Sequence, residues 1–302
     1  MSARFQALGE KLEPRYDYFR GTVEDDPLTV LDALCEDLGM KGRKGCKGPP
    51  QYDHSVGLWQ SSAEVETKAA DVVVSYGGNG GADPGVLSRG GFADKLVPVL
   101  RANWPHQARA TRIDSCVDLC DGFDAIEAKM QEMHRERRIA RMRYGVPETG
   151  QTFTLGGKSS PMKCRVYQKG LQLLPSMSPD ERFFFERWTR VEAEYHPRSA
   201  EKEKAMHLSA LDVWGAARWT ADLLEWVAEQ QPAILDRKPR MDRTAKERLE
   251  FMLRMNSRTI LEVAAEEGPD AVLELVNMVL RGELGPLTRA DISPQASRAH
   301  VH

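Results

Sequence analysis

The segment Thr111-Arg-Ile-Asp-Ser-Cys-Val-Asp-Leu119 alternates polar and apolar residues, and this alternation indicates a β-strand. Alternate residues of a strand face the same side of a sheet. One side of this strand is therefore expected to carry Arg112, Asp114, Cys116 and Asp118. The other side carries Ile113, Val117 and Leu119, which are suited to a buried core.

Two later segments repeat the pattern. Cys164-Arg-Val-Tyr-Gln-Lys-Gly170 places Arg165, Tyr167 and Lys169 on one face. Thr189-Arg-Val-Glu-Ala-Glu-Tyr195 places Arg190, Glu192 and Glu194 on one face, and Tyr195 on the opposite one. If the three strands lie side by side, carboxylates, cations and a tyrosine meet on one sheet face. For any one such strand, the ordinary alternative is a solvated polar face.

The surrounding sequence predicts further strands and helices. Strands are expected at residues 52–60, 72–76 and 152–155, with a hairpin turn at Gly156 and Gly157 before the Tyr167 strand. Helices are expected at residues 28–38 and 92–103, and a third is expected to start at Asp121 as N-cap and to stop before Gly145. The third has Phe123, Ile126, Met130 and Met133 on one side, the spacing of a buried stripe.

The order of these elements predicts an α+β fold, in which an antiparallel sheet is followed by an all-helical C-terminal region. Residues 1–50 are expected to form an N-terminal lead-in with a flexible basic loop rich in Gly and Pro. Residues 51–200 form the predicted α+β domain. Residues 201–285 form the predicted helical region, with long helices up to residue 230 and shorter ones at 243–255, 259–266 and 270–280. Residues 286–302 are predicted to be a disordered tail.

Composition narrows the class of protein. The chain has 302 residues, of which 41% are hydrophobic and 29% charged, with a formal net charge of −3. This balance favours a folded protein, and no apolar run reaches the ~18 residues of a membrane span, so a cytoplasmic protein without membrane partners is expected. The five cysteines are expected to be reduced thiols, and Cys116 and Cys120 lack a second pair at zinc spacing.

The shared face of the three strands has the residue types needed for chemistry on a phosphodiester. Carboxylates clustered on a rigid sheet bind Mg²⁺ or Mn²⁺ through oxygen. Such a metal polarises a phosphoryl oxygen, while Arg or Lys stabilises developing charge. A tyrosine hydroxyl is a weak nucleophile at its free pKa near 10, and a nearby cation would favour the phenolate.

Five segments together resemble the replication initiation factor family. They are residues 77–80 (Gly-Gly-Asn-Gly), 111–118, 156–159 (Gly-Gly-Lys-Ser), 165–169 (Arg-Val-Tyr-Gln-Lys) and 188–194 (Trp-Thr-Arg-Val-Glu-Ala-Glu). The resemblance covers roughly residues 55–220, and the last two segments are its most specific parts. The family includes rolling-circle replication initiators of filamentous phages and small staphylococcal plasmids, and related relaxases of conjugative elements.

This resemblance implies metal-dependent, site-specific nicking and joining of one DNA strand through a 5′-phosphotyrosine. It implies Tyr167 as the nucleophile, with Arg165 and Lys169 as its catalytic neighbours. It also implies Mg²⁺ or Mn²⁺ as the cofactor, held by Asp114 and Glu192, with Asp118 and Glu194 as looser assignments. Plasmid members usually have Asp or Asn where this chain has Gln168. The His-hydrophobic-His metal pair of other nicking enzymes occurs here only as residues 300–302, where no strand is expected.

Basic side chains suggest where DNA is bound. Lys158 and Lys163 are close to the proposed site and are expected to contact the phosphate backbone. Arg135, Arg138 and Arg141 belong to a basic stretch that could equally complement a helix dipole. The helical region after residue 200 is expected to read the origin, and residues 243–266 give a weak helix-turn-helix pattern.

The expected partners are double-stranded origin DNA and single-stranded DNA, with a host helicase, a polymerase and a second copy of the chain as further partners. Three other functions stay open: a relaxase of a conjugative or integrative element, a non-catalytic DNA-binding regulator, and a nuclease that uses metal-bound water. A tyrosine recombinase is disfavoured because its nucleophile lies near the C-terminus, and the last tyrosine here is Tyr195.

Overall fold

The computed structural model describes residues 12–44, 46, 48–60, 69–78, 82–174, 185–235 and 257–281. The chain divides into two compact units, Met1–Asp236 and Arg237–His302. The predicted helix at 243–255, the predicted tail at 286–302 and parts of the segments 77–80 and 243–266 lie outside the described residues.

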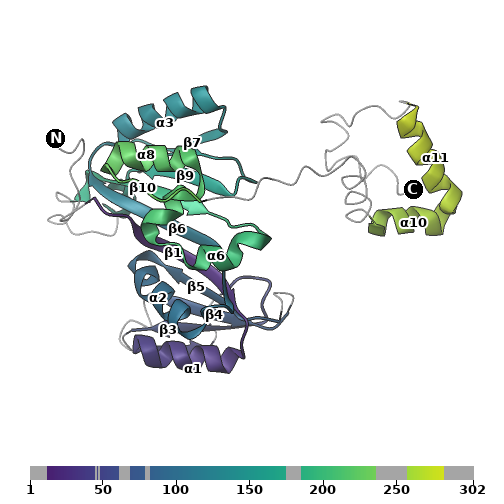
Figure 1. Ribbon diagram of the computed structural model, residues 1–302, viewed down its shortest axis with the longest axis horizontal. Helices are drawn as coiled ribbons and strands as arrows, with labels where there is room; N and C mark the ends of the chain where they lie inside the picture. Colours follow the sequence, from purple (N-terminus) through teal and green to yellow (C-terminus); the bar gives the residue numbers. More distant parts are fainter. Residues whose placement is uncertain are drawn as a thin grey trace. The chain divides into compact units, whose positions relative to one another are not determined.

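The described part of the first unit contains one antiparallel sheet in the order β2-β3-β4-β5-β1-β6-β10-β9-β8-β7 (Figure 1). The strands are β1 (Arg15–Val23), β2 (Lys41–Lys44), β3 (His54–Trp59), β4 (Val72–Tyr76), β5 (Gly85–Arg89), β6 (Ala108–Cys120), β7 (Arg141–Val146), β8 (Gly150–Leu155), β9 (Met162–Tyr167) and β10 (Trp188–Tyr195). The predicted α+β class is therefore confirmed, and the three charged strands are neighbours in the sheet.

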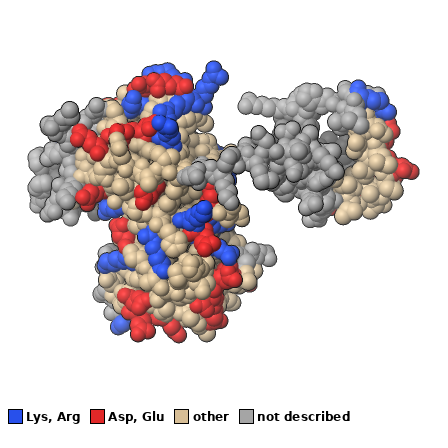
Figure 2. All heavy atoms as spheres, viewed as in Figure 1, with Lys and Arg blue, Asp and Glu red and all other residues tan. Residues whose placement is uncertain are grey.

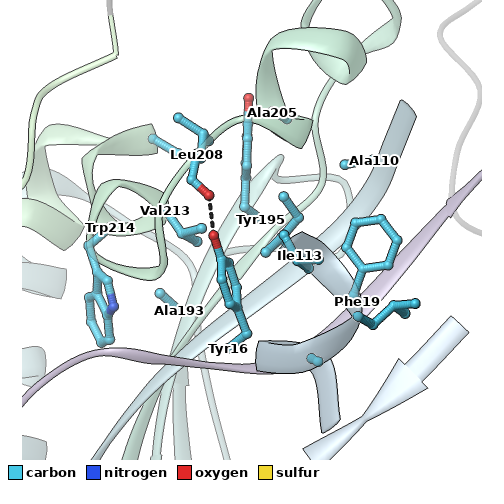
Figure 3. Packing of buried hydrophobic residues seen from close by; sticks show 14 of the residues in the cluster. Tyr16, Phe19, Ala110, Ile113, Ala193, Tyr195, Ala205, Leu208, Val213 and Trp214 are labelled. Carbon is cyan, nitrogen blue, oxygen red and sulfur yellow. Dashed lines mark hydrogen bonds between the residues drawn. The ribbon is translucent and has the colours of Figure 1, made fainter. Parts of the chain in front are cut away.

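Helices pack against one face of this sheet. They are α1 (Pro27–Leu38), α2 (Ala93–Asn103), α3 (Phe123–Arg137), α6 (Lys202–Met206), α7 (Ala210–Val213) and α8 (Arg218–Ala228). Their apolar residues join those of the strands in one core, in which Ile113 and Tyr195 lie side by side and Tyr16 lies between them and Trp214 (Figure 3). The predicted burial of Tyr195 is correct, since its exposed fraction is 1%.

Buried hydrogen bonds attach the segments after β10 to this helical face. The indole Nε1 of Trp214 donates to the Ser115 hydroxyl at 2.9 Å, and that hydroxyl donates to the Ala210 carbonyl at 2.7 Å. The Tyr16 hydroxyl donates to the Leu208 carbonyl (Figure 3). These bonds satisfy polar groups that burial would otherwise leave unpaired. Residues up to 230 form short helical elements, among them η6 (Trp214–Ala216) and α8. These short elements stand where the sequence predicted long helices.

The N-terminal lead-in predicted for residues 1–50 is wrong. β1 lies between β5 and β6 in the sheet and buries Phe19 and Val23, each 1% exposed. Its pairing with β6 is interrupted between Tyr16 and Tyr18, which is a β-bulge. A bulge inserts one extra residue and breaks the alternation that identifies a strand, so the pattern is hard to read from the sequence. The predicted basic loop also begins with a strand, β2, paired with β3.

The third predicted helix needs two corrections. It begins after Gly122 and not with Asp121 as N-cap, because Asp121 itself has φ 87° and its carboxylate binds Arg187. The helix ends at Arg137, and Arg138 closes it with φ 54°. The chain then forms the edge strand β7, so Arg141 and Arg143 are in a strand. The predicted stripe of Phe123, Ile126, Met130 and Met133 is buried as expected.

The second unit contains α10 (Ser257–Glu267) and α11 (Pro269–Leu280) among its described residues. These two helices confirm the predictions for residues 259–266 and 270–280. In the described part of the chain, no helix has both the length and the apolar character needed to cross a membrane.

Candidate functional site

The sheet face opposite the helices collects the charged residues of β6, β10 and β9. In the register of these strands, Glu192 lies opposite Arg165 on one side and Cys116 on the other. Glu194 lies opposite Asp114, and Arg190 lies opposite both Asp118 and Tyr167. The structure therefore brings the predicted residues together. It differs from the expectation in their burial, since the exposed fractions of Glu192 and Asp114 are 0% and 1%.

Asp114 and Glu192 form the buried centre of this face. The Nε of Arg112 donates to Asp114 Oδ1 at 2.8 Å, and Arg165 donates to Glu192 Oε1. Arg165 also lies 3.9 Å from Asp114 Oδ2. Burial raises the pKa of Asp114 well above its usual value, and the neighbouring Glu192 carboxylate raises it further. Two buried carboxylates in contact need a shared proton or a cation between them.

Tyr167 lies beside this pair. Its hydroxyl donates to Glu192 Oε2 at 3.1 Å, and its exposed fraction is 7%. Burial raises the pKa of Tyr167 above its usual value, and the negative charge of Glu192 acts in the same direction. The protein residues alone thus favour the phenol over the phenolate that was expected. The same geometry gives the phenol an acceptor for its proton, the Glu192 carboxylate.

Two cations flank the Tyr167 ring. Arg165 Cζ and Lys169 Nζ each lie 5.7 Å from the ring centroid. Lys169 is not on the strand as predicted, because β9 ends at Tyr167 and α4 (Lys169–Leu173) begins directly after it. Burial lowers the pKa of Lys169, and the positive charge of Arg190 lowers it further. Lys169 is therefore a better proton donor than an exposed lysine.

A small cavity opens directly at the Tyr167 ring. Its volume is about 170 Å³, and its lining is almost entirely polar. The lining residues are Tyr144, Thr152, Arg165, Tyr167, Lys169 and Gln172. A tyrosine and two cations that line one cavity are suited to a phosphate group. Tyr144, Thr152 and Gln172 were missed from sequence, since nothing in their segments marks them before the strand order is known.

Asp118 belongs to a separate cluster. Arg190 donates to it twice, at 2.6 Å from Nε and 2.9 Å from Nη2, and the Trp188 indole donates at 2.7 Å. Arg190 also binds Asp17 at 2.6 Å, a β1 residue that sequence reasoning missed because it lies in the bulge. Burial opposes ionisation of Asp118, but the bonds and charge of Arg190 keep its pKa below its usual value.

Glu194 is held at the other end of the face. Lys163 Nζ lies 2.7 Å and Arg112 Nη2 lies 2.9 Å from its carboxylate oxygens, and His196 Nε2 lies 2.7 Å from Oε1. Burial opposes its ionisation, yet the bonds from His196 and Lys163 keep the pKa of Glu194 well below its usual value. This carboxylate already has three partners.

All four carboxylates predicted to bind a metal have cationic partners in this structure. Asp114 and Glu192 lie together at the centre of the face, Asp118 is bonded to Arg190, and Glu194 is bonded to Lys163 and shares Arg112 with Asp114. Over the described ranges, no group of three or more His, Cys, Asp or Glu side chains is placed to hold a metal ion. The Asp114–Glu192 pair offers oxygen donors of the kind that Mg²⁺ and Mn²⁺ prefer, although an arginine bonds each of these carboxylates in this structure. The assignment of Asp118 and Glu194 as further metal ligands stays a prediction.

The residues predicted to contact DNA are divided between the two faces of the sheet. Lys163 is on the same side of β9 as Tyr167, and Lys158 lies in the turn between β8 and β9. Arg135 and Arg138 are on α3 and at its end, on the helical side. Arg141 lies opposite the core residue Leu155, and its neighbour Arg143 forms an ion pair with Glu127 of α3 at 3.2 Å. Viewed from the side of α8 and α6, basic and acidic side chains are intermixed on the surface (Figure 2).

Gln168, which differs from the plasmid members of the resembled family, has a structural contact. Its Oε1 accepts a hydrogen bond from the Gln151 backbone N–H at 2.9 Å, which ties the end of β9 to the start of β8. The turn between these strands contains Gly156 at φ 105°, and a Cβ there would lie 2.7 Å from the Met162 carbonyl oxygen. The predicted hairpin with its glycine turn is confirmed.

No protein-family model matches the chain, and the search of curated proteins found no match. Among solved structures, the chain is similar to the structure titled rolling circle replication initiator protein from Geobacillus stearothermophilus. The identity is 19% and the TM-score 0.48, over 80% of this chain and 95% of that chain. A likeness at this level leaves the function to be argued from the geometry of the site.

Proposed function

We propose that this protein initiates rolling-circle replication by nicking one DNA strand with Tyr167 and remaining attached to the 5′ end. One observation carries the proposal. The Tyr167 hydroxyl donates to the buried Glu192 carboxylate, beside a polar cavity that Arg165 and Lys169 also line. These are a nucleophile, a proton acceptor and two cations within one site. The motif resemblance places the nucleophile at the same tyrosine.

The proposed reaction is a transesterification. The scissile phosphate occupies the cavity, where Arg165 and Lys169 stabilise the charge of the transition state. Glu192 Oε2 takes the proton of the Tyr167 hydroxyl as the oxygen attacks phosphorus. The new bond joins Tyr167 Oη to phosphorus, and the bond from phosphorus to the 3′ oxygen breaks. Lys169 gives a proton to the leaving 3′ oxygen, which becomes a hydroxyl that a polymerase can extend.

A divalent metal would be held by Asp114 and Glu192. When bound, Mg²⁺ or Mn²⁺ supplies Lewis-acid polarisation of the phosphate. Asp118 and Glu194 act in this proposal by fixing Arg190, Lys163 and Arg112 in place. The protein would act on double-stranded origin DNA and on the single strand, in the cytoplasm, with a host helicase and polymerase. A relaxase would use the same chemistry for transfer of DNA.

The test is capture of a covalent adduct. The purified chain is incubated with a random-sequence single-stranded DNA library and Mg²⁺ or Mn²⁺, denatured, and separated on a gel. Sequencing of the attached DNA identifies the cut site, and mass spectrometry of the digested adduct identifies the modified residue. A nucleotide on Tyr167 is the expected result. Cleavage without an adduct would favour hydrolysis by metal-bound water, and DNA binding without cleavage would favour a regulator.

A further inference from the structure

A second and larger cavity lies on the same sheet face as Tyr167. Its volume is about 530 Å³, and strands β1, β3, β4 and β5 form its floor. The floor residues are Tyr18, Arg20, Trp59, Val73, Leu87 and Arg89. The segment 48–50, part of the loop rich in Gly and Pro, forms a wall. The proposed nicking reaction makes no use of this cavity.

The pairing of β1 with β6 connects the cavity to the catalytic face. Tyr18 lies opposite Asp114, and Arg20 lies opposite Arg112. The Arg112 guanidinium lies 4.4 Å from the centroid of the Tyr18 ring and also binds Asp114. From the strand spacing and the rise per residue, the cavity begins roughly 20 Å from Tyr167. A DNA strand cut at Tyr167 can cross Arg112 and reach this cavity along one continuous face.

Two glycines build the cavity. A Cβ at Gly57 would lie 2.4 Å from Cη2 of Trp59, so the absence of a side chain there lets the indole lie against the sheet as floor. A Cβ at Gly48 would lie 1.8 Å from the Ser55 hydroxyl, so the wall segment packs directly on β3. Both positions are close approaches that only glycine allows. The wall at Gly48 and the floor at Trp59 therefore pack directly against the sheet.

The lining has a specific chemical character. Its rings are those of Tyr18 and Trp59, its other floor residues are apolar, and its charged members are two arginines, Arg20 and Arg89. Aromatic rings stack on bases, and arginine contacts phosphates and aromatic faces. A flat ring joined to a phosphate is thus the ligand that this lining fits. We propose that the cavity holds a base of the single strand that is cut at Tyr167, with Arg20 and Arg89 at its phosphates; the identity of that strand rests on the proposed function.

Photo-crosslinking tests the location without any need for nicking. The full chain is irradiated with an oligothymidylate that carries 5-iodouracil at single positions, and the crosslinked peptides are mapped by mass spectrometry. The proposal expects crosslinks to Tyr18 or Trp59 from some positions of the strand. Crosslinks confined to other parts of the chain overturn it, even if Tyr167 forms its adduct. Crosslinks at the cavity without any adduct would support it and would count against the nicking reaction.

Affinity measurements test the arginines. Arg89→Gln and Arg20→Gln are compared with Arg137→Gln, an exposed arginine of α3 that pairs with Asp222 on the helical side. One stacked base contributes about 1–3 kcal/mol, so a long oligothymidylate should bind about 5- to 150-fold more tightly than a short one that cannot reach the cavity. The proposal expects that ratio to fall several-fold in the first two variants and to stay unchanged in Arg137→Gln. An equal ratio in all three overturns it.

A base joined to a phosphate could belong to the DNA strand or to a free nucleotide. Competition with a free nucleotide distinguishes these two ligands. Thymidine 5′-monophosphate and a nucleoside triphosphate are added to the crosslinking reaction at increasing concentration. A strand held at several points should resist displacement by either one, and this result supports the proposal. Complete loss of the cavity crosslinks at micromolar nucleotide would instead assign the cavity to a free nucleotide and overturn its assignment to the strand.

Discussion

Replacement of Tyr167 by Phe removes a single hydroxyl, and the structure gives its effect on both stability and activity. The hydroxyl donates to Glu192 Oε2 at 3.1 Å, which is long for an O–H···O bond. Glu192 also keeps its bond from Arg165. The loss should therefore be near the lower end for a buried bond, about 1 kcal/mol. For a unit of this size, that corresponds to a decrease in Tm of about 2–4 °C.

The stability effect is larger than the ~0.5 kcal/mol expected for an exposed sheet face, because Tyr167 is buried. The activity effect should be complete, since Phe has no oxygen to attack phosphorus. The assay is adduct formation on a denaturing gel, with Tm measured by calorimetry on the same preparations.

Tyr195→Phe is the matched control. Its hydroxyl also lies near a carboxylate, 3.2 Å from Glu201 Oε2, but on the opposite side of the sheet. This variant should keep its adduct. An adduct of normal yield from Tyr167→Phe would refute the mechanism. An unchanged Tm would refute the hydrogen bond to Glu192.

Three further predictions concern the Asp114–Glu192 pair, the cluster around Arg190 and the second compact unit. Asp114→Asn and Glu192→Gln should each abolish nicking while DNA affinity in a gel-shift assay is kept, and activity of either variant in excess EDTA would disprove the metal role. Arg190→Met should lower the free energy of unfolding by about 3–5 kcal/mol in a denaturant titration, because Asp17 loses its buried cation and Asp118 keeps only the partly exposed Arg15. A change below ~1 kcal/mol would show that the cluster tolerates the absence of Arg190. A chain ending at residue 236 should fold, since the first compact unit ends there, and should nick DNA with reduced preference for the captured origin. Equal preference would place recognition in the first unit.

The sequence was a good guide where alternation is regular. The faces of β6, β9 and β10 could be assigned from parity alone, because a strand without a bulge keeps a period of two. The hairpin at Gly156 was readable for the same reason. The strand order brings Asp114, Glu192 and Tyr167 together. The resemblance of motifs indicated that these residues share a site but did not give their positions in space.

The sequence was a poor guide to β1 and to the burial and ion pairing of the charged side chains. The bulge near Asp17 hides the strand, so this carboxylate at Arg190 could not be found. The alternation of residues along a strand also predicts only that charged residues share a face. It does not predict whether that face is exposed to water. Here they neutralise one another and are buried, so that Asp118 is paired with Arg190 and Glu194 with Lys163. Such pairing depends on neighbours that are distant in sequence.

The middle of the sheet joins strands that are far apart in the sequence and are therefore synthesised at different times. Asp17 of β1 and Arg190 of β10 are separated by 173 residues, and Gln230 donates to the Leu12 carbonyl across 218 residues. Pairings of this kind require long loops to close and make folding slow. The hairpins β3–β4 and β8–β9 can form early, whereas β1 waits for β5 and then β6 to leave the ribosome before both of its edges are paired. We expect the nascent N-terminal strand to need protection from aggregation during that interval.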